Sequence, residues 1–89
     1  MGLDLVELIM EVERTFDVTI SNAQAEQSVT VGQLYDVVRA QIVERNPTDA
    51  PGYTGPQWER YLTLVEHELG VPRDQLTPEA HFVKDLGVD

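Results

Sequence analysis

Apolar residues at the start of the chain recur at the spacing of an amphipathic helix. They fall at i, i+3, i+4, i+7 and i+11, so their side chains share one helix face: Leu5, Leu8, Ile9, Val12 and Phe16. Acidic residues fill much of the remaining surface, opposed by a single base, Arg14. The pattern predicts a helix over residues 3–16 with one face in the core and an acidic outer surface.

Two capping motifs predict the next helices. Ser21 and Gln24 have the spacing of a capping box, in which each side chain accepts a hydrogen bond from the backbone of the other, and they open a short helix over residues 23–27. Thr30 and Gln33 repeat the motif at the start of a longer helix. The apolar face of that longer helix is formed by Val31, Leu34, Val37, Val38 and Ile42.

Residues 46–56 differ in amino-acid composition from the segments on either side. They contain three prolines and two glycines, which is typical of a linker or a long surface loop. Thr54 and Gln57 again have the capping spacing, and a helix over about 57–69 is predicted to follow. Its apolar face is formed by Trp58, Tyr61, Leu62, Val65 and Leu69. Gly70 is suited to ending this helix in a left-handed conformation.

Two irregular stretches are too apolar to lie free in solvent. Val18 and Ile20 are expected to be buried in an extended segment that is too short for a paired strand. The tail, residues 71–89, is expected to lie across the helix ends and to bury Phe82 and Leu86. With three sizeable helices, one short helix and no sheet signal, the 89 residues predict a single small all-α domain, a helical bundle.

Charge and composition limit the partners of this domain. Sixteen acidic residues against six basic ones give a formal net charge of −10, which repels phosphate backbones and anionic membranes and attracts basic protein surfaces. We therefore expect no nucleic-acid binding. No apolar run approaches the roughly 20 residues needed to cross a bilayer. The acidic start does not resemble a targeting peptide, and a cytoplasmic location is expected.

The residue types offer no visible catalytic or metal site. The chain has no cysteine, which excludes disulfides, thiol nucleophiles and zinc–cysteine clusters. His67 and His81 have no neighbouring ligand at metal-binding spacing, and we interpret them as a surface residue and a packing residue. No Ser/His/Asp or Cys/His arrangement and no glycine-rich phosphate loop is present. We expect neither an enzyme nor a metalloprotein.

Long segments of the chain resemble the acyl carrier proteins, which carry acyl chains on a 4′-phosphopantetheine arm. LDLVELIMEVERTF, at residues 3–16, is similar to the second, partner-recognising helix of that family, and DVTISNAQAEQSVTVGQLYDVV is similar to its third and fourth helices. LTLVEHELGVPRDQLTPEAHFVKDLGVD, at residues 62–89, is similar to the end of its first helix and the long loop that follows. The resemblance implies a four-helix acyl-carrier bundle.

The order of these segments is circularly permuted relative to the family. Residues 1–45 resemble family helices two to four, residues 57–89 resemble helix one and its loop, and residues 46–56 form the new connection. A connection of this length reaches easily between neighbouring helix ends, at roughly 3.3 Å per residue. We expect a monomer. A domain-swapped dimer, in which residues 57–89 pack on a neighbouring copy, is a further option.

The resemblance also locates the position of the family's modified serine, which follows an aspartate and precedes a leucine. Here those three positions fall on Asp89, Gly2 and Leu3. Glycine has no hydroxyl, so as written the chain is expected to carry no phosphopantetheine and no other cofactor. Ser28 occupies a position where the family has a bulky apolar residue lining the acyl pocket, which makes such a pocket more polar.

The outer face of the first helix has two interpretations. It is either a plain solvated surface or, as the resemblance implies, a docking surface for basic patches on acyl-processing or biosynthetic enzymes. Its residues are Asp4, Val6, Glu7, Met10, Glu11 and Glu13, with the two apolar side chains at the centre. Three functions remain open at this stage. They are a carrier-like protein of fatty acid or polyketide biosynthesis without the attachment serine, a non-acylated docking module, and a helical domain of unrelated role.

Overall fold

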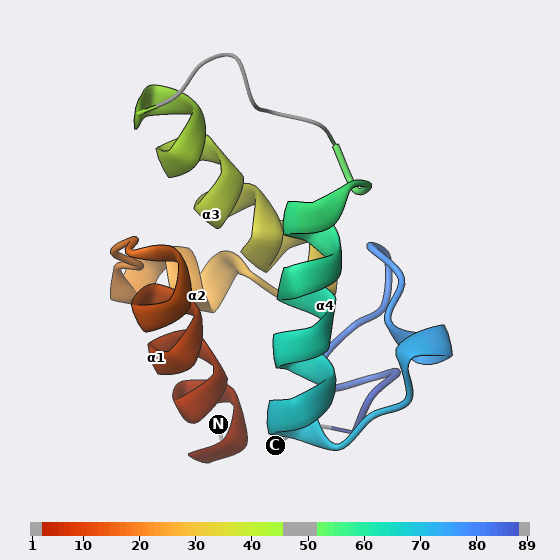
Figure 1. Cartoon of the computed structure of the whole chain (residues 1–89). Helices are drawn as coiled ribbons and strands as arrows, with labels where there is room; N and C mark the ends of the chain where they lie inside the picture. Colours follow the sequence, from red (N-terminus) through yellow and green to blue (C-terminus); the bar gives the residue numbers. More distant parts are fainter. Residues whose placement is uncertain (1–2, 46–51, 88–89) are drawn as a thin grey trace.

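The computed structural model describes residues 3–45 and 52–87 and confirms the all-α fold. The helices are α1 (Leu3–Phe16), α2 (Asn22–Gln27), α3 (Val31–Arg45) and α4 (Pro56–Leu69), followed by a single 3₁₀ turn, η1 (Arg73–Gln75) (Figure 1). In these two ranges there is no strand, and the one extended pairing is an isolated bridge between Thr30 and His81. Part of the predicted connection, residues 46–51, lies outside the described ranges.

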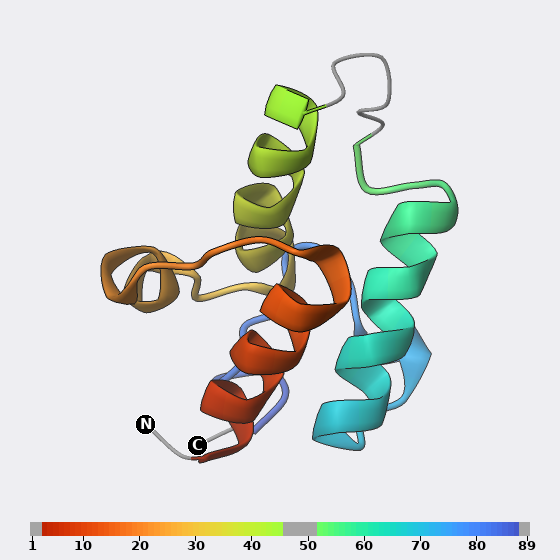
Figure 2. The same cartoon turned by 60° about the vertical axis from the view of Figure 1, so that its left-hand side comes forward.

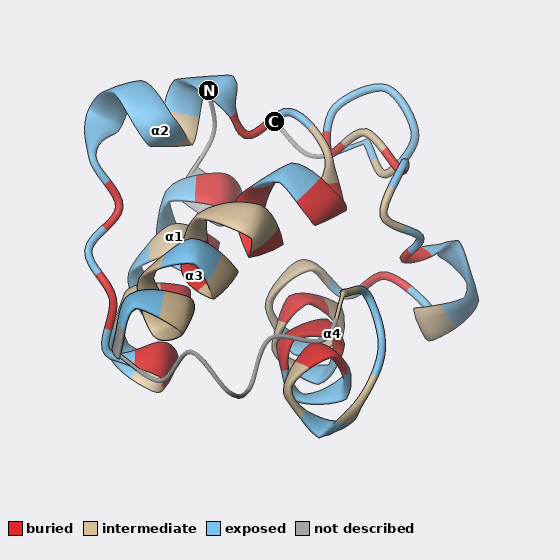
Figure 3. Ribbon diagram, turned by 90° about the horizontal axis from the view of Figure 1, so that it is seen from above, coloured by how far each residue is buried: buried red, intermediate tan, exposed pale blue. Residues whose placement is uncertain are grey.

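The helix pair α1 and α4 forms the centre of the bundle, and Figure 2 shows the two side by side. The apolar faces predicted for both helices point inward, and Leu8, Val12, Tyr61 and Val65 are fully buried. The buried residues form one cluster, coloured red in Figure 3, that also takes in Leu5, Phe16, Val18, Ile20, Val31, Leu34, Tyr35, Val38, Trp58, Leu62, Val71, Leu76, Ala80 and Phe82. The expected burial of Val18 and Ile20 is therefore confirmed.

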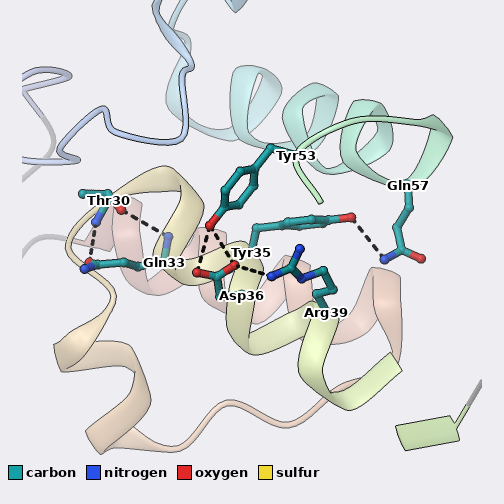
Figure 4. Close-up of polar contacts among 7 residues, drawn as sticks. All are labelled: Thr30, Gln33, Tyr35, Asp36, Arg39, Tyr53 and Gln57. Carbon is teal, nitrogen blue, oxygen red and sulfur yellow. Dashed lines mark hydrogen bonds and ion pairs between the residues drawn. The ribbon is translucent and has the colours of Figure 1, made fainter. Parts of the chain in front are cut away.

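Two of the three predicted capping boxes are present. The Ser21 Oγ accepts a hydrogen bond from the Gln24 N–H at 3.1 Å, and the Gln24 Oε1 accepts one from the Ser21 N–H at 3.0 Å. The same reciprocal pair, with both distances 3.1 Å, joins Thr30 and Gln33 (Figure 4). Each pair satisfies backbone donors that a helix start leaves without an intrahelical partner.

The prediction of a third capping box, at Thr54 and Gln57, is wrong. Helix α4 begins at Pro56 with Gly55 as its cap, and no side chain caps it. Gly55 has a φ of 93°, in the region that favours glycine. The Gln57 side chain turns away from the helix start, because its Nε2 donates to the hydroxyl of Tyr35 at 3.2 Å (Figure 4).

The described tail, residues 71–87, folds back over the beginning of α3. Two N–H groups in the first turn of α3, of Val31 and Gly32, donate to the carbonyls of Ala80 and Pro78 at 3.0 and 2.9 Å. Phe82 is 1% exposed and Leu86 is half-buried, so the prediction that the tail covers the core is confirmed, fully for the first and partly for the second. The tail thus serves as the cap of a helix that lies far from it in sequence.

Four aromatic rings fill the space between α3 and α4: Tyr35, Tyr53, Trp58 and Tyr61. The Trp58 ring lies 4.9 Å from that of Tyr35 and 5.3 Å from that of Tyr53, measured between centroids. The Tyr53 hydroxyl donates to the Asp36 carboxylate, with both oxygens at 2.9 Å (Figure 4). The described end of the connection, residues 52–55, is therefore fastened to α3 by a side chain.

Candidate functional site

The outer face of α1 combines exposed apolar and acidic side chains. Val6 is 40% exposed and Met10 is 53% exposed, although large apolar residues of a small domain are usually covered. They lie four residues apart on the helix and therefore neighbour each other. Glu7 is exposed beside them, and Glu11 is half-exposed and forms an ion pair with Arg14 at 3.3 Å. We call Val6, Glu7, Met10 and Glu11 the α1 face.

Glu13, predicted as part of the same surface, also holds the chain that follows α1. Its Oε2 accepts a hydrogen bond from the Ile20 N–H at 2.8 Å, and its backbone carbonyl accepts one from the Val18 N–H at 3.1 Å. The chain reverses at Asp17, which has a left-handed φ of 54°. No local pattern could have assigned this structural role to Glu13, because the bond depends on how the turn folds back.

A groove lies between the α1 face and the segment that follows the turn. It has a volume of 210 Å³, and Val6, Ile9 and Met10 of α1 face Ile20 and Ala25 across it. An apolar groove beside carboxylates can receive an apolar side chain of a partner while the rim attracts the partner's basic residues.

A second, larger cleft lies where the start of α1 meets the tail. Its volume is 360 Å³, and its wall is mostly apolar: Leu5, Ala25, Val29, Phe82 and Val83, together with Glu26 and Ser28. The cleft thus joins residues from the beginning and the end of the described chain. Ser28 is 6% exposed, and its Oγ donates to the backbone carbonyl of Gln24 at 2.7 Å.

The position predicted for the modified serine falls at the edge of the described chain. Leu3 is the first residue of α1, whereas Gly2 and Asp89 lie outside the described ranges. Asp4 belongs to the first turn of α1. The two serines of the chain lie elsewhere in helix caps: the Ser21 hydroxyl accepts the capping hydrogen bond of α2, and Ser28, the C-cap of α2, is buried.

Two tyrosines of the aromatic cluster between α3 and α4 have raised pKa values, which follow from their packing. Burial raises the pKa of the Tyr61 phenol well above 10.0, with Asp36 and Tyr35 adding to the effect. Burial and the hydrogen bond to Asp36 also raise the pKa of Tyr53. The His67 side chain is largely exposed, and the backbone N–H of His81, not its imidazole, donates to the Asp85 carboxylate at 2.8 Å. Among the described residues, no three His, Asp or Glu side chains come together as a metal site.

The fold and the α1 face together define a small all-α domain with an acidic, partly apolar helix surface. Over 44 residues the chain is 46% identical to an acyl carrier protein of Amoebophilus asiaticus (strain 5a2). This match relates the chain to the acyl carrier protein family. The aligned stretch covers 49% of this chain and 55% of the relative, so the chain spans about half the length of the curated relative it matches. No family model and no solved structure matches the chain.

Within the described ranges, no helix has both the length and the apolar character needed to cross a membrane.

Proposed function

We propose that this chain is an acyl-carrier-like protein that docks on acyl-processing enzymes through the α1 face. The observation that carries the proposal is the exposure of Val6 and Met10 beside Glu7 and Glu11. A net charge of −10 attracts a basic partner surface from a distance, and the two apolar side chains add contact area once the surfaces meet. The curated relative is named as a carrier protein, a class without catalytic activity, and the proposal accordingly assigns no reaction to this chain.

The docking proposal is tested with a broad-specificity phosphopantetheinyl transferase as the probe. The double variant Glu7→Lys, Glu11→Lys is expected to bind the transferase at least about tenfold more weakly by calorimetry, because charge complementarity is reversed. Glu44→Lys with Asp74→Lys makes the same change of net charge at exposed positions of α3 and η1. This control is expected to retain most of the binding. Equal losses in both variants would show that only total charge matters and would refute a specific α1 face.

We infer further that the order of the segments is circularly permuted. A linear alignment can follow only one of two exchanged segments, and the 44 aligned residues are close in number to the segment 1–45. Leu5 from the beginning of the chain and Phe82 from its end line one cleft, as neighbouring parts of a continuous chain would. The end of α3 and the start of α4 lie at the same end of the molecule (Figures 1 and 2). This arrangement suits a connection between former termini.

The permutation is tested with a reordered chain in which residues 57–89 precede a serine and then residues 3–45. We expect it to fold with the same helix content and the same protected core amides as the original chain. A reordered chain that fails to fold would contradict the permutation. Light scattering on the original chain then separates the proposed monomer from a domain-swapped dimer.

Whether the chain carries a phosphopantetheine arm is a separate question, and the sequence and structure favour a chain without that arm. Gly2 lacks the hydroxyl that forms the phosphodiester, and the two serines of the chain serve as a helix cap and a buried hydrogen-bond donor. These observations favour the second candidate function, a non-acylated docking module. Intact mass after incubation with coenzyme A and the transferase decides between the two. The original chain is expected to gain nothing, while the reordered chain with its serine gains one phosphopantetheine. A gain by the original chain would make it a true carrier.

A further inference from the structure

Met10 is the one residue of the α1 face that carries an oxidisable group. Its side chain is 53% exposed, and it does not belong to the buried core cluster. It is also the only sulfur-containing residue in ranges 3–45 and 52–87, because the chain has no cysteine and its other methionine, Met1, lies outside them. The other apolar residue of the face, Val6, is a plain hydrocarbon. An oxidant that reaches the α1 face therefore has one target, the thioether sulfur of Met10.

Met10 also lies where a partner would make apolar contact. It lines the 210 Å³ groove beside the α1 face together with Val6, Ile9, Ile20 and Ala25. A methionine side chain is flexible and polarizable, so it adapts to the apolar surface that a partner presents. Oxidation to the sulfoxide makes this side chain polar and chiral. Burying the sulfoxide oxygen against an apolar surface costs free energy unless a hydrogen-bond donor meets it.

We propose that Met10 is a modification site, at which oxidation of the thioether by a neutral hydroperoxide weakens docking through the α1 face. The proposal rests on the docking function proposed above. With hydrogen peroxide, the Met10 sulfur attacks one oxygen, an S–O bond forms and the O–O bond breaks. The proton of the attacked hydroxyl passes to the departing oxygen, which leaves as water. The sulfur loses two electrons and the peroxide gains them.

The reverse step needs a reductant from outside, because the chain has no cysteine of its own. Methionine sulfoxide reductases, with one enzyme for each sulfoxide epimer, supply it from a dithiol. The dithiol becomes a disulfide, and the sulfoxide oxygen leaves as water. Oxidation of Met10 is therefore a reversible modification, unlike the higher oxidation states of cysteine.

The acidic surroundings of Met10 influence both the oxidant and the size of the effect. Glu7 is exposed and Glu11 half-exposed on the same face, and the chain carries a net charge of −10. This charge repels anionic oxidants but not a neutral hydroperoxide. The sulfoxide is neutral, so oxidation leaves the attraction for a basic partner unchanged and removes only the apolar contact. We therefore expect affinity to fall without being abolished.

The experiment measures binding of the transferase by calorimetry, before and after the full chain is treated with hydrogen peroxide. Catalase removes the peroxide before the transferase is added, and peptide mass mapping reports oxidation at Met10 and Met1 separately. The oxidised wild type is expected to bind about tenfold more weakly, because the exposed half of the Met10 side chain no longer contributes apolar burial. Treatment with both reductases and a dithiol is expected to restore the original affinity.

Met10→Leu is the matched control. This substitution conserves volume and apolar character, so the variant is expected to bind nearly as well as the wild type before treatment. It carries no sulfur at position 10 but keeps Met1, so peroxide is expected to leave its affinity unchanged. The Tm of the oxidised wild type is expected to equal that of the untreated chain, because Met10 lies outside the core cluster.

Four results would overturn the inference. They are unchanged affinity after oxidation of Met10, an equal loss in Met10→Leu, a Met10 that stays reduced while Met1 reacts, and a fall in Tm that accompanies the loss of binding. Binding that the reductases do not restore would overturn its reversibility. An untreated wild type that does not bind the transferase refutes the docking function itself, and the inference with it, before any peroxide is added.

Discussion

Gly32 lies in the first turn of α3, where the tail crosses the helix, and replacing it by alanine tests that crossing. An added Cβ would lie 2.8 Å from the Pro78 carbonyl oxygen and 3.0 Å from the Pro78 Cβ. Real Cβ atoms essentially never approach other atoms to 2.8 Å, and the obstructing oxygen belongs to the backbone. It is also the oxygen that accepts the hydrogen bond from the Gly32 N–H. The tail must therefore move away from α3.

The magnitude follows from two opposing effects. Alanine is a better helix former than glycine by about 1 kcal/mol in a helix interior, and by less in a first turn. Forcing a methyl group into a packed site typically costs about 1–3 kcal/mol, and displacement weakens two hydrogen bonds of roughly 0.5–1.5 kcal/mol each. We expect Gly32→Ala to lower the free energy of unfolding by about 1–2 kcal/mol. In a domain of this size the Tm then falls by roughly 4–16 °C.

Thermal unfolding followed by far-UV circular dichroism measures this effect, with Gly52→Ala as the matched control. A Cβ on Gly52 would meet only the Arg39 Nη1, at an ordinary 3.6 Å, and no positive φ opposes alanine there. The control is expected to be as stable as the wild type or slightly more stable, by about 0.4–1 kcal/mol. A Gly32→Ala variant that matches or exceeds the wild type would show that the tail does not lie against α3 as described.

Three further predictions concern the tyrosines of the aromatic cluster. Tyr61→Phe removes a buried donor at 2.8 Å from the Val31 carbonyl and is expected to destabilise the fold by about 1–3 kcal/mol in urea unfolding. Tyr53→Phe removes the bond to Asp36 at a residue that is 40% exposed, so a smaller loss of about 0.5–1.5 kcal/mol is expected in the same assay. The raised pKa of Tyr61 means that its phenol stays protonated in the folded state when the unfolded chain already ionises, near pH 10.0. The contribution of this phenol to the free energy of unfolding is therefore fully present below that pH and is lost as the pH rises above it. Tyr61→Phe should flatten the decline of stability with pH. An equally steep decline in this variant would assign the effect to other groups.

Features that depend only on residues close together in the sequence could be predicted. The core face of α1 follows from helical spacing, and the boxes at Ser21 and Thr30 follow from two residues three positions apart. The end of α4 is another local feature, since Gly70 adopts a φ of 67° and its N–H bonds the Glu66 carbonyl at 2.9 Å. Such features depend on only a few consecutive residues, and the structure confirms each of them.

Features that need a distant partner could not be predicted. The Thr54 box failed because the Gln57 amide binds Tyr35, 22 positions away, in place of its own helix start. The complete burial of Tyr35 depends on Trp58 and Tyr61 across the bundle, and its position on α3 does not reveal it. In the candidate site, helical spacing predicted that Val6 and Met10 lie together, whereas the hydrogen bond from Ile20 to Glu13 appears only after the turn is folded. The 360 Å³ cleft could not be predicted either, because Phe82 and Val83 of the distant tail form part of its wall.

The packing of α1 against α4 has a consequence for how fast the chain folds. These two helices form the main contact of the bundle, yet α2, α3 and the connection separate them along the chain. Neither helix can bury its apolar face until that long loop closes, and closure of long loops slows folding more than it lowers stability. The reordered chain would bring α4 and α1 closer together in sequence, separated only by the tail. Stopped-flow refolding of the two chains should therefore give a larger rate constant for the reordered one at similar equilibrium stability.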